Sequence, residues 1–217
     1  MDAEPLLITS EARVAAATEL RALAHALVAH QVDEATLVDI AQTARGLRAA
    51  CEASPDRRGE LEEVRIRALA ARSAAGDPFE RHHVEGSLFA DSFVSGQANP
   101  MGLNAHMSVE GDESVARVTL GAAFEGAPGR CHGGVVAALI DETMGGVLQT
   151  IQAFAFTGRL SVTYRAATPL HVPLECRARV LHREGRKLTI AATLRSGEDL
   201  LVEAEALFII VDPTRWA

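Results

Sequence analysis

The sequence has no excess of basic residues and few aromatic ones. Its 217 residues include 21 Lys and Arg against 29 Asp and Glu, which gives a formal net charge of −8. Because binding to nucleic-acid phosphates requires a basic face, this balance argues against a DNA or RNA partner. Aromatic side chains make up only 4% of the chain, so few residues are available to stack on an aromatic ligand.

Cysteine is also scarce, and long hydrophobic runs are missing. Cys51, Cys131 and Cys176 lie far apart without C-x-x-C spacing, so neither a zinc ribbon nor a disulfide framework is indicated, and a reducing compartment fits best. The apolar stretch free of charge from Thr143 to Gly158 is too short to cross a bilayer. The first residues, MDAEPLL, carry acids where a signal peptide carries basic residues. We therefore expect a cytoplasmic protein with no integral membrane segment.

Residues 1 to about 75 have a helical composition, rich in Ala, Leu, Arg and Glu. Apolar residues at helical spacing follow an N-cap residue at Asp33. A second patterned segment, GELEEVRIRALAARSAAG, ends at Gly76 with Pro78 just beyond, which is the usual order of helix stop signals. The segment DPFERHHVEGS then reads as a linker. We predict a helical N-terminal extension over residues 1–80 and a second domain over residues 81–217.

The second domain begins with short β-type pieces. SLFADSFV comes first, and LNAHMSVEG and SVARVTLGAAF then flank a Gly-Asp-Glu turn at residues 111–113, which predicts a hairpin. Four further runs of strand character end the chain: FAFTGRLSVTYRA, LECRARVLHRE, RKLTIAATLRSG and LLVEAEALFIIV.

Between the hairpin and the last four runs lies a segment that is apolar nearly all round, from Gly133 to about Ile151. Such a segment predicts a buried helix. A single apolar helix needs a sheet large enough to cover it, so we expect an α+β domain in which five or six antiparallel strands curl around that helix.

The carboxylate of Asp141 is the informative residue of this helix, because a buried charge is costly unless it is paired, hydrogen-bonded or at a cleft. The simplest alternative is that Asp141 and Glu142 face solvent on one wet stripe. However, Gly133 and Gly134 begin the helix, and their backbone N–H groups and the helix dipole could receive a carbonyl oxygen, as an oxyanion hole does.

The spacing of these residues constrains any joint action. Eight residues separate Gly133 from Asp141, and at 1.5 Å per residue this is roughly 12 Å along the axis. One carbonyl group cannot touch both. If both act on one group, they come from two antiparallel copies of the helix across a two-fold axis, which predicts a site shared in a homodimer.

The run HGGVVAALIDETMG, followed by AFTGRLSVTYRAATPL and EGRK, resembles the hotdog-fold acyl-CoA thioesterases of the phenylacetate-pathway and thioesterase-superfamily-member type. The resemblance covers about Asn99 to Val211, with NPMGL, FEGAPGRCHGG, an Asp nine positions after the His and a Thr sixteen after the Asp, all in order. It implies a curled antiparallel sheet around one central helix, dimers or tetramers, and hydrolysis of acyl-CoA thioesters without a metal or other cofactor.

The resemblance also assigns roles. Asp141 matches the catalytic carboxylate, Gly133 the oxyanion donor, and Thr157 the hydroxyl that positions water, while His132 orders the loop or touches the thioester. Gly126 departs from the pattern, since many relatives carry an amide side chain there. Residues that match or adjoin substrate-binding positions, including those along the pantetheine and nucleotide of CoA, are Gly134, Thr163, Arg165, Arg186 and Lys187.

Several of these residues also have plainer interpretations. His132 could be a turn residue satisfied by backbone, and Thr157 an ordinary strand threonine. The three basic residues could simply be solvated charges at strand ends. Cys131 next to His132 suggests a Cys-His nucleophile, but sequence neighbours on a turn seldom share that geometry.

The sequence thus predicts an acyl-CoA thioesterase in which Asp141 acts as base or nucleophile. The alternative is a non-catalytic acyl-CoA or lipid-binding module of the same fold. A hotdog dehydratase is a third option, although its His and acid pairing is not where we would expect it. The low aromatic content favours aliphatic acyl chains of medium to long length, and the spacing does not distinguish base from nucleophile.

Overall fold

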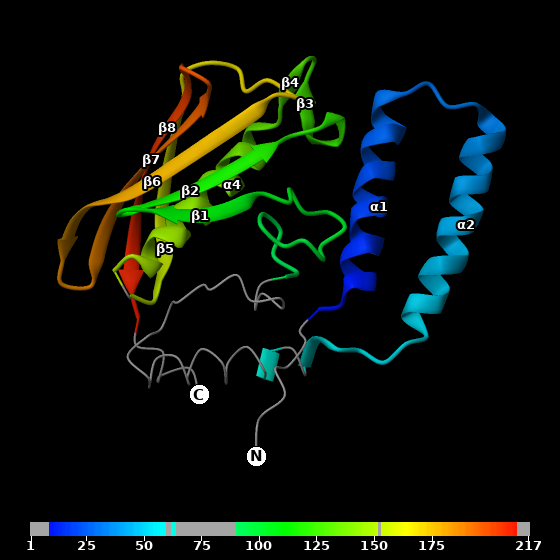
Figure 1. Cartoon of the computed structure of the whole chain (residues 1–217), viewed down its shortest axis with the longest axis horizontal. Coiled ribbons are helices and arrows are strands. Elements are labelled where there is room, and N and C mark those ends of the chain that lie inside the picture. Colours follow the sequence, from blue (N-terminus) through cyan, green and yellow to red (C-terminus); the bar gives the residue numbers. More distant parts are fainter. Residues whose placement is uncertain (1–8, 60–61, 64–89, 152, 212–217) are drawn as a thin grey trace.

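The computed structural model describes residues 9–59, 62–63, 90–151 and 153–211 (Figure 1). Its helices are α1 (Glu11–Ala29), α2 (Glu34–Glu52) and α4 (Gly133–Gly146), with the short 3-10 turns η1 (Ala122–Phe124) and η2 (Val147–Gln149). Its strands are β1 (His106–Glu110), β2 (Glu113–Thr119), β3 (Glu125–Ala127), β4 (Arg130–Cys131), β5 (Ala155–Tyr164), β6 (Pro173–Glu184), β7 (Lys187–Ser196) and β8 (Asp199–Ile210).

Six of these strands form one antiparallel sheet in the order β1-β2-β6-β7-β8-β5. Helix α4 lies against one face of this sheet (Figure 1). Strand β5 is therefore an edge strand although it follows the helix directly in sequence. The predicted α+β arrangement, with one buried helix and a large antiparallel sheet, is confirmed.

The core lies between α4 and the inner face of the sheet. Leu139, Ile140 and Met144 of the helix are fully buried and belong to the same cluster as Leu188 and Ile190 of β7. Burial of each such side chain contributes about 1.5–3 kcal/mol relative to exposure. The nearly uniform apolarity of the helix is explained by this position.

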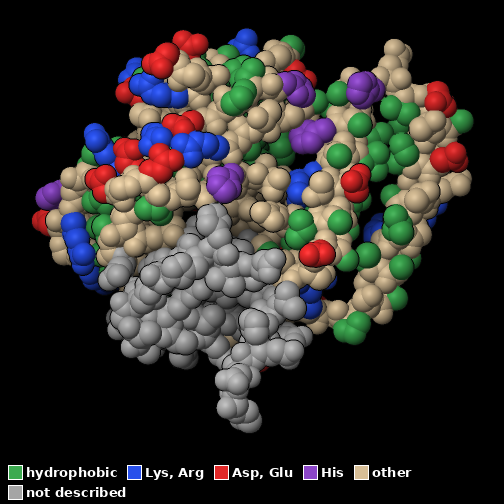
Figure 2. All heavy atoms as spheres, in the orientation of Figure 1, with side chains coloured by type: hydrophobic (Ala, Val, Ile, Leu, Met, Phe, Trp, Pro, Cys, Tyr) green, Lys and Arg blue, Asp and Glu red, His purple; other side chains and the backbone are tan. Residues whose placement is uncertain are grey.

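The outer face of the sheet is polar. Arg117 and Arg177 form ion pairs with three glutamates on neighbouring strands, at N–O distances from 2.6 to 3.1 Å. Figure 2 shows acidic and basic side chains gathered over this part of the molecule. The glutamates are Glu110, Glu113 and Glu175. The face away from α4 therefore faces solvent, and the helix covers only one side.

Of the two described N-terminal helices, α1 packs against the rest of the structure. In α1, Ala17 and Arg21 are buried, whereas α2 has no buried residue. The predicted cap at Asp33 is confirmed, because its side chain accepts a hydrogen bond from the Thr36 N–H at 3.0 Å. The segment from Gly59 to Gly76, the linker and the boundary at residue 80 lie almost entirely outside the described residues.

Two strand predictions are wrong in part. Residues 90–94, expected as part of a strand, form turns, because Ser92 and Ser95 donate hydrogen bonds to Glu142 on α4 instead of to a neighbouring strand. Strand β2 ends at Thr119, since the chain turns into η1. The helix also ends sooner than expected, at Gly146, and the loop before it contains the small β3–β4 hairpin.

Candidate active site

The start of α4 is shaped by His132, which is the N-cap residue. Its Nδ1 accepts a hydrogen bond from the Gly134 N–H at 2.9 Å, so the expectation that both glycine amides are open is wrong for Gly134. The Gly133 N–H makes no hydrogen bond to the described part of the chain. One backbone donor therefore remains for a ligand, at the positive end of the helix dipole.

Gly126 lies against His132. A Cβ atom at Gly126 would lie 2.6 Å from the His132 Cα and 2.8 Å from its Cβ. Any larger residue would displace the histidine or the β3 backbone.

The predicted partners Asp141 and Thr157 are in contact. The Thr157 hydroxyl donates a hydrogen bond to Asp141 Oδ1 at 2.7 Å. Asp141 is half-buried, and no Lys or Arg of the described residues forms an ion pair with it. The carboxylate is thus held by a hydroxyl group without being neutralised by a cation.

A β-bulge at Gly158 makes this contact possible. The pairing of β5 with β8 shifts between Thr157 and Arg159, so side-chain alternation changes by one residue there. Because of this shift, Thr157 points to the same inner face as Leu160 and Tyr164. Thr157, Leu160, Val162 and Tyr164 lie opposite the buried β8 residues Phe208, Ala206, Ala204 and Val202.

The neighbouring carboxylate, Glu142, has a different role. It accepts hydrogen bonds from the Ser92 hydroxyl at 2.7 Å, the Ser95 N–H at 3.1 Å and the Ser95 hydroxyl. These contacts attach the loop before β1 to the helix. The adjacent acids of the sequence therefore have different partners: Glu142 bonds to the loop before β1, and Asp141 bonds to Thr157.

We expect Glu142→Ala to lower the free energy of unfolding by about 2–3 kcal/mol, because several part-buried donors lose a charged acceptor at once. Urea unfolding measures this. Glu205→Ala is the matched control, since Glu205 is exposed on β8 and makes no side-chain hydrogen bond within the described residues. Equal stability of the two variants would contradict the structural role of Glu142.

The Cys131-His132 alternative is not supported. Cys131 is buried, and this burial raises the pKa of its thiol to about 11. Its Sγ faces the His132 carbonyl oxygen at 3.7 Å, while the imidazole Nδ1 bonds to Gly134. The pair lacks the arrangement that would yield a thiolate.

The two halves of the predicted site lie at opposite ends of β5. The Tyr164 hydroxyl donates a hydrogen bond to the Gly133 carbonyl oxygen at 2.7 Å, while Thr157 contacts Asp141. The helix therefore runs along the strand, with its start at Tyr164 and its acid at Thr157. Sequence reasoning missed Tyr164, although an aromatic residue near the end of an edge strand was a usable signal.

The predicted CoA-contact residues lie elsewhere. Thr163 pairs with Glu203 on the outer face of the sheet, and Arg165 forms an ion pair with the same glutamate at 2.7 Å. Arg186 and Lys187 follow the β6–β7 turn, where Arg186 donates to the Ile210 carbonyl at 2.8 Å. None of the four forms a hydrogen bond or ion pair with Asp141 or Thr157, and all are exposed.

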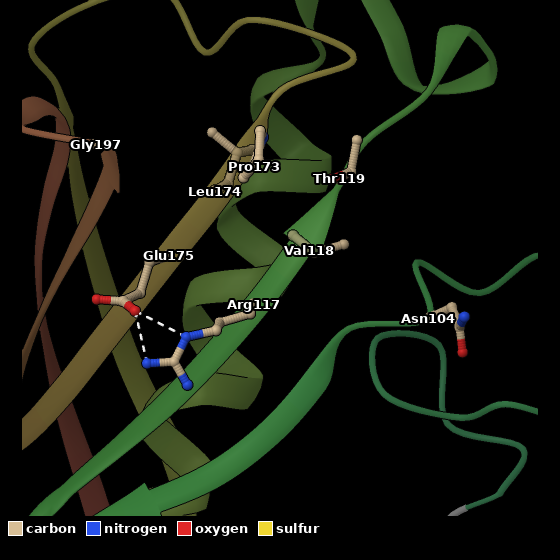
Figure 3. Close-up of a pocket in the computed structure, with 8 residues that line it drawn as sticks. All are labelled: Asn104, Arg117, Val118, Thr119, Pro173, Leu174, Glu175 and Gly197. Atoms are coloured by element: carbon tan, nitrogen blue, oxygen red, sulfur yellow. Dashed lines mark hydrogen bonds and ion pairs between the residues drawn. The ribbon is translucent and has the colours of Figure 1, made fainter.

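A pocket of about 540 Å³ lies on the polar side of the sheet, over β2 and β6 (Figure 3). The ion pair between Arg117 and Glu175 lines it, and α4 lies behind these strands. This pocket is thus separate from Asp141 and Gly133. No described group of three or more His, Cys, Asp or Glu could hold a metal ion. No helix in the described residues is long and apolar enough to span a membrane.

Comparisons with known proteins agree with this geometry. A family model described as thioesterase superfamily matches residues 128–203, which include Asp141, Gly133 and Thr157. Acyl-coenzyme A thioesterase THEM4 of Mus musculus is 36% identical over 94 residues, 42% of this chain and 40% of that protein. The Xenopus laevis THEM4 is 36% identical over 92 residues, 42% of this chain and 41% of that protein. The chain thus matches about two fifths of the length of these relatives.

A crystal structure of a thioesterase superfamily protein superposes with a TM-score of 0.72 and 24% identity, over 92% of this chain and 96% of that chain. An alignment of that extent includes the N-terminal helices, so the likeness in fold reaches beyond the curled sheet. Over residues 128–203 the chain is similar to the thioesterase superfamily, and its structure has the hotdog fold.

Proposed function

We propose that this chain hydrolyses acyl-CoA thioesters at a site completed across a homodimer. The observation that carries the proposal is the Thr157–Asp141 hydrogen bond, which holds an unneutralised carboxylate at the edge of the helix. The printed name of the THEM4 relatives supplies the substrate class. The unused amide of Gly133 supports an acyl transfer reaction, since it is a donor for a developing oxyanion.

The proposed reaction begins with the thioester carbonyl oxygen bound to the Gly133 N–H. Asp141 of the partner subunit either removes a proton from a water molecule that attacks the carbonyl carbon, or attacks that carbon itself. The C–S bond then breaks, and CoA leaves as a thiolate that takes up a proton from the active site or from water. Where Asp141 itself has attacked, the acyl group is left on Asp141 as an anhydride, which a water molecule hydrolyses to free the carboxylate and the acid. The products are a carboxylic acid and CoA.

The edge strand β5 supports the dimer part of the proposal. Its outer edge pairs with no other strand of the described chain, and such an edge is a template for another strand. A second copy paired antiparallel, with the two-fold axis between Leu160 and Ser161, would set Thr157 opposite Tyr164 of the partner subunit. That register unites Asp141 of one chain with Gly133 of the other. A tetramer could be built from two such dimers.

The direct test is a panel of acyl-CoAs of different chain length, with release of CoA measured by a thiol-detecting dye. Release with any of them supports hydrolysis. Saturable binding without release would reject the enzyme and favour the acyl-CoA-binding module. The same panel gives the acyl preference, for which we expect aliphatic chains of medium to long length.

We expect Thr157→Val to lower kcat about tenfold with little change in KM, because it removes one hydrogen bond to the carboxylate and keeps the side-chain shape. Thr157→Ser keeps the hydroxyl and serves as the matched control. Steady-state rates of CoA release measure both. Wild-type kcat in Thr157→Val would mean that the threonine is only a strand residue.

A further inference from the structure

Helix α1 contacts the η1 turn, which precedes the start of α4 where the proposed oxyanion donor lies. Figure 1 places α1 beside the loop before β1 and the β3–β4 hairpin. The contact with the hairpin side is made by His25, whose Nδ1 accepts a hydrogen bond from the Ala123 N–H at 3.0 Å. Its ring also packs edge-on against Phe124, with ring centroids 5.0 Å apart.

The fit between His25 and this segment is close. A Cβ atom at Gly121 would lie 2.6 Å from His25 Nδ1, so the glycine allows the backbone before η1 to approach the imidazole. Four residues earlier in α1, the Arg21 guanidinium donates hydrogen bonds to the Gln97 and Asn99 carbonyl oxygens at 3.0 and 2.6 Å. Helix α1 is thus fixed at two separate loops.

A short series of hydrogen bonds continues from His25 to His132 and Gly134, the two neighbours of Gly133 in the chain. The Phe124 carbonyl, in the same turn as Ala123, accepts the His132 N–H at 2.8 Å. The His132 ring then caps α4 through Gly134. Gly133 lies between His132 and Gly134 in the chain, and its N–H is the proposed oxyanion donor. A shift of η1 would therefore move the start of α4 and the direction of that amide.

We propose that His25 is a positioning residue for the oxyanion donor, acting through η1 and His132. The inference rests on the proposed thioester hydrolysis. His25 does not touch the substrate in this proposal. It fixes the loop because a neutral Nδ1 lone pair faces the Ala123 N–H, and the imidazole proton is then carried on Nε2.

This contact depends on the charge of His25. The pKa of His25 is lowered from its ordinary value of 6.5 by burial, and further by His171 and Arg21. These two are the titratable or charged groups that act on it, Arg21 from α1 and His171 from the β5–β6 connection. When α1 is docked on η1, His25 holds fewer protons than when it is free in solvent. The contribution of this contact to docking is therefore fully present above pH 6.5 and is lost as the pH falls below it.

The test compares His25→Ala with His25→Asn, whose Oδ1 can occupy the position of Nδ1 and does not titrate. We expect His25→Ala to lower kcat between about tenfold and 100-fold with a smaller change in KM, and His25→Asn to restore most of it. The ratio of wild-type kcat to His25→Asn kcat should fall as the pH goes from 7.5 to 5.5. His30→Ala, an exposed histidine at the end of α1, is the matched control.

Hydrogen exchange supplies a readout that is independent of activity. In His25→Ala, exchange should become faster at the amides of Ala123 and His132, with β6 to β8 unchanged. Wild-type kcat and exchange in His25→Ala would overturn the proposal, as would a His25→Asn variant as slow as His25→Ala. Faster exchange in His25→Ala with no CoA release by any variant, wild type included, would support the link between α1 and the loop and reject the proposed hydrolysis.

Discussion

Asp141→Asn should lower kcat for acyl-CoA hydrolysis between about 10²-fold and 10⁴-fold, because the amide can neither accept a proton from water nor attack the thioester. The substitution keeps the side-chain shape, and the Asn Oδ1 can still accept the Thr157 hydrogen bond. Binding should therefore persist, with a Kd for acyl-CoA within a few-fold of wild type. Calorimetric titration and CoA release on the same preparation measure both quantities.

The control for this variant is Asp112→Asn, which changes an exposed carboxylate in the β1–β2 turn. It should have wild-type kcat. Near-normal turnover by Asp141→Asn would reject the mechanism. It would favour the alternative that Asp141 is a solvent-facing residue of the helix without a catalytic role. Single-turnover hydrolysis in ¹⁸O-labelled water separates the two possible roles, since label in the Asp141 carboxylate requires an anhydride and therefore attack by Asp141 itself.

Mixing two inactive variants should restore activity if the site is shared. Gly133→Pro removes the proposed donor N–H, and Asp141→Asn removes the carboxylate, so each homodimer should be inactive. After subunit exchange at equal concentrations, half of the dimers are mixed, and each holds one intact site. We expect about a quarter of wild-type activity per protomer. CoA release before and after exchange measures the gain.

The structure makes the proline variant interpretable. Gly133 is the first residue of α4, a position where proline is compatible with the helix, and His132 before it is already extended, with ψ of 131°. A Cβ there would lie 3.2 Å from the Tyr164 hydroxyl, so Gly133→Ala controls for that contact while keeping the N–H. Native mass spectrometry must detect the mixed dimer. A mixed dimer with no recovered turnover would reject the shared site.

Local patterns in the sequence predicted much of the fold. The all-round apolarity of α4 predicted burial, the Gly-Asp-Glu turn predicted β1 and β2, and Asp33 predicted a helix cap. Features set by long-range contacts were missed. Residues 90–94 alternate like a strand, but Ser92 and its neighbours bond to Glu142, about fifty positions away. The docking of α1 through His25 has no local signal either, since its partner is 98 residues distant.

Some features of the candidate site were likewise predicted from the sequence, and others were not. The family resemblance paired Asp141 with Thr157, and the two side chains are in contact. The side-chain rotamer of His132 decides that the Gly134 N–H is hydrogen-bonded and the Gly133 N–H is not. Residue spacing in a sequence does not reveal a rotamer. The outer-face location of Thr163 follows from strand register, and that register depends on the bulge at Gly158.

The bulge at Gly158 divides β5 into two segments. Odd-numbered side chains lie on one face of the sheet before the bulge and on the other face after it. In the segment from Arg159 to Tyr164, even positions face the helix, while Thr157 faces it from an odd position. Deleting one residue at the bulge would restore uniform alternation and turn the hydroxyl to solvent without altering any residue that contacts Asp141. When proteins of this fold are aligned or recombined, a one-residue gap at this point therefore matters more than substitution at most positions of the strand.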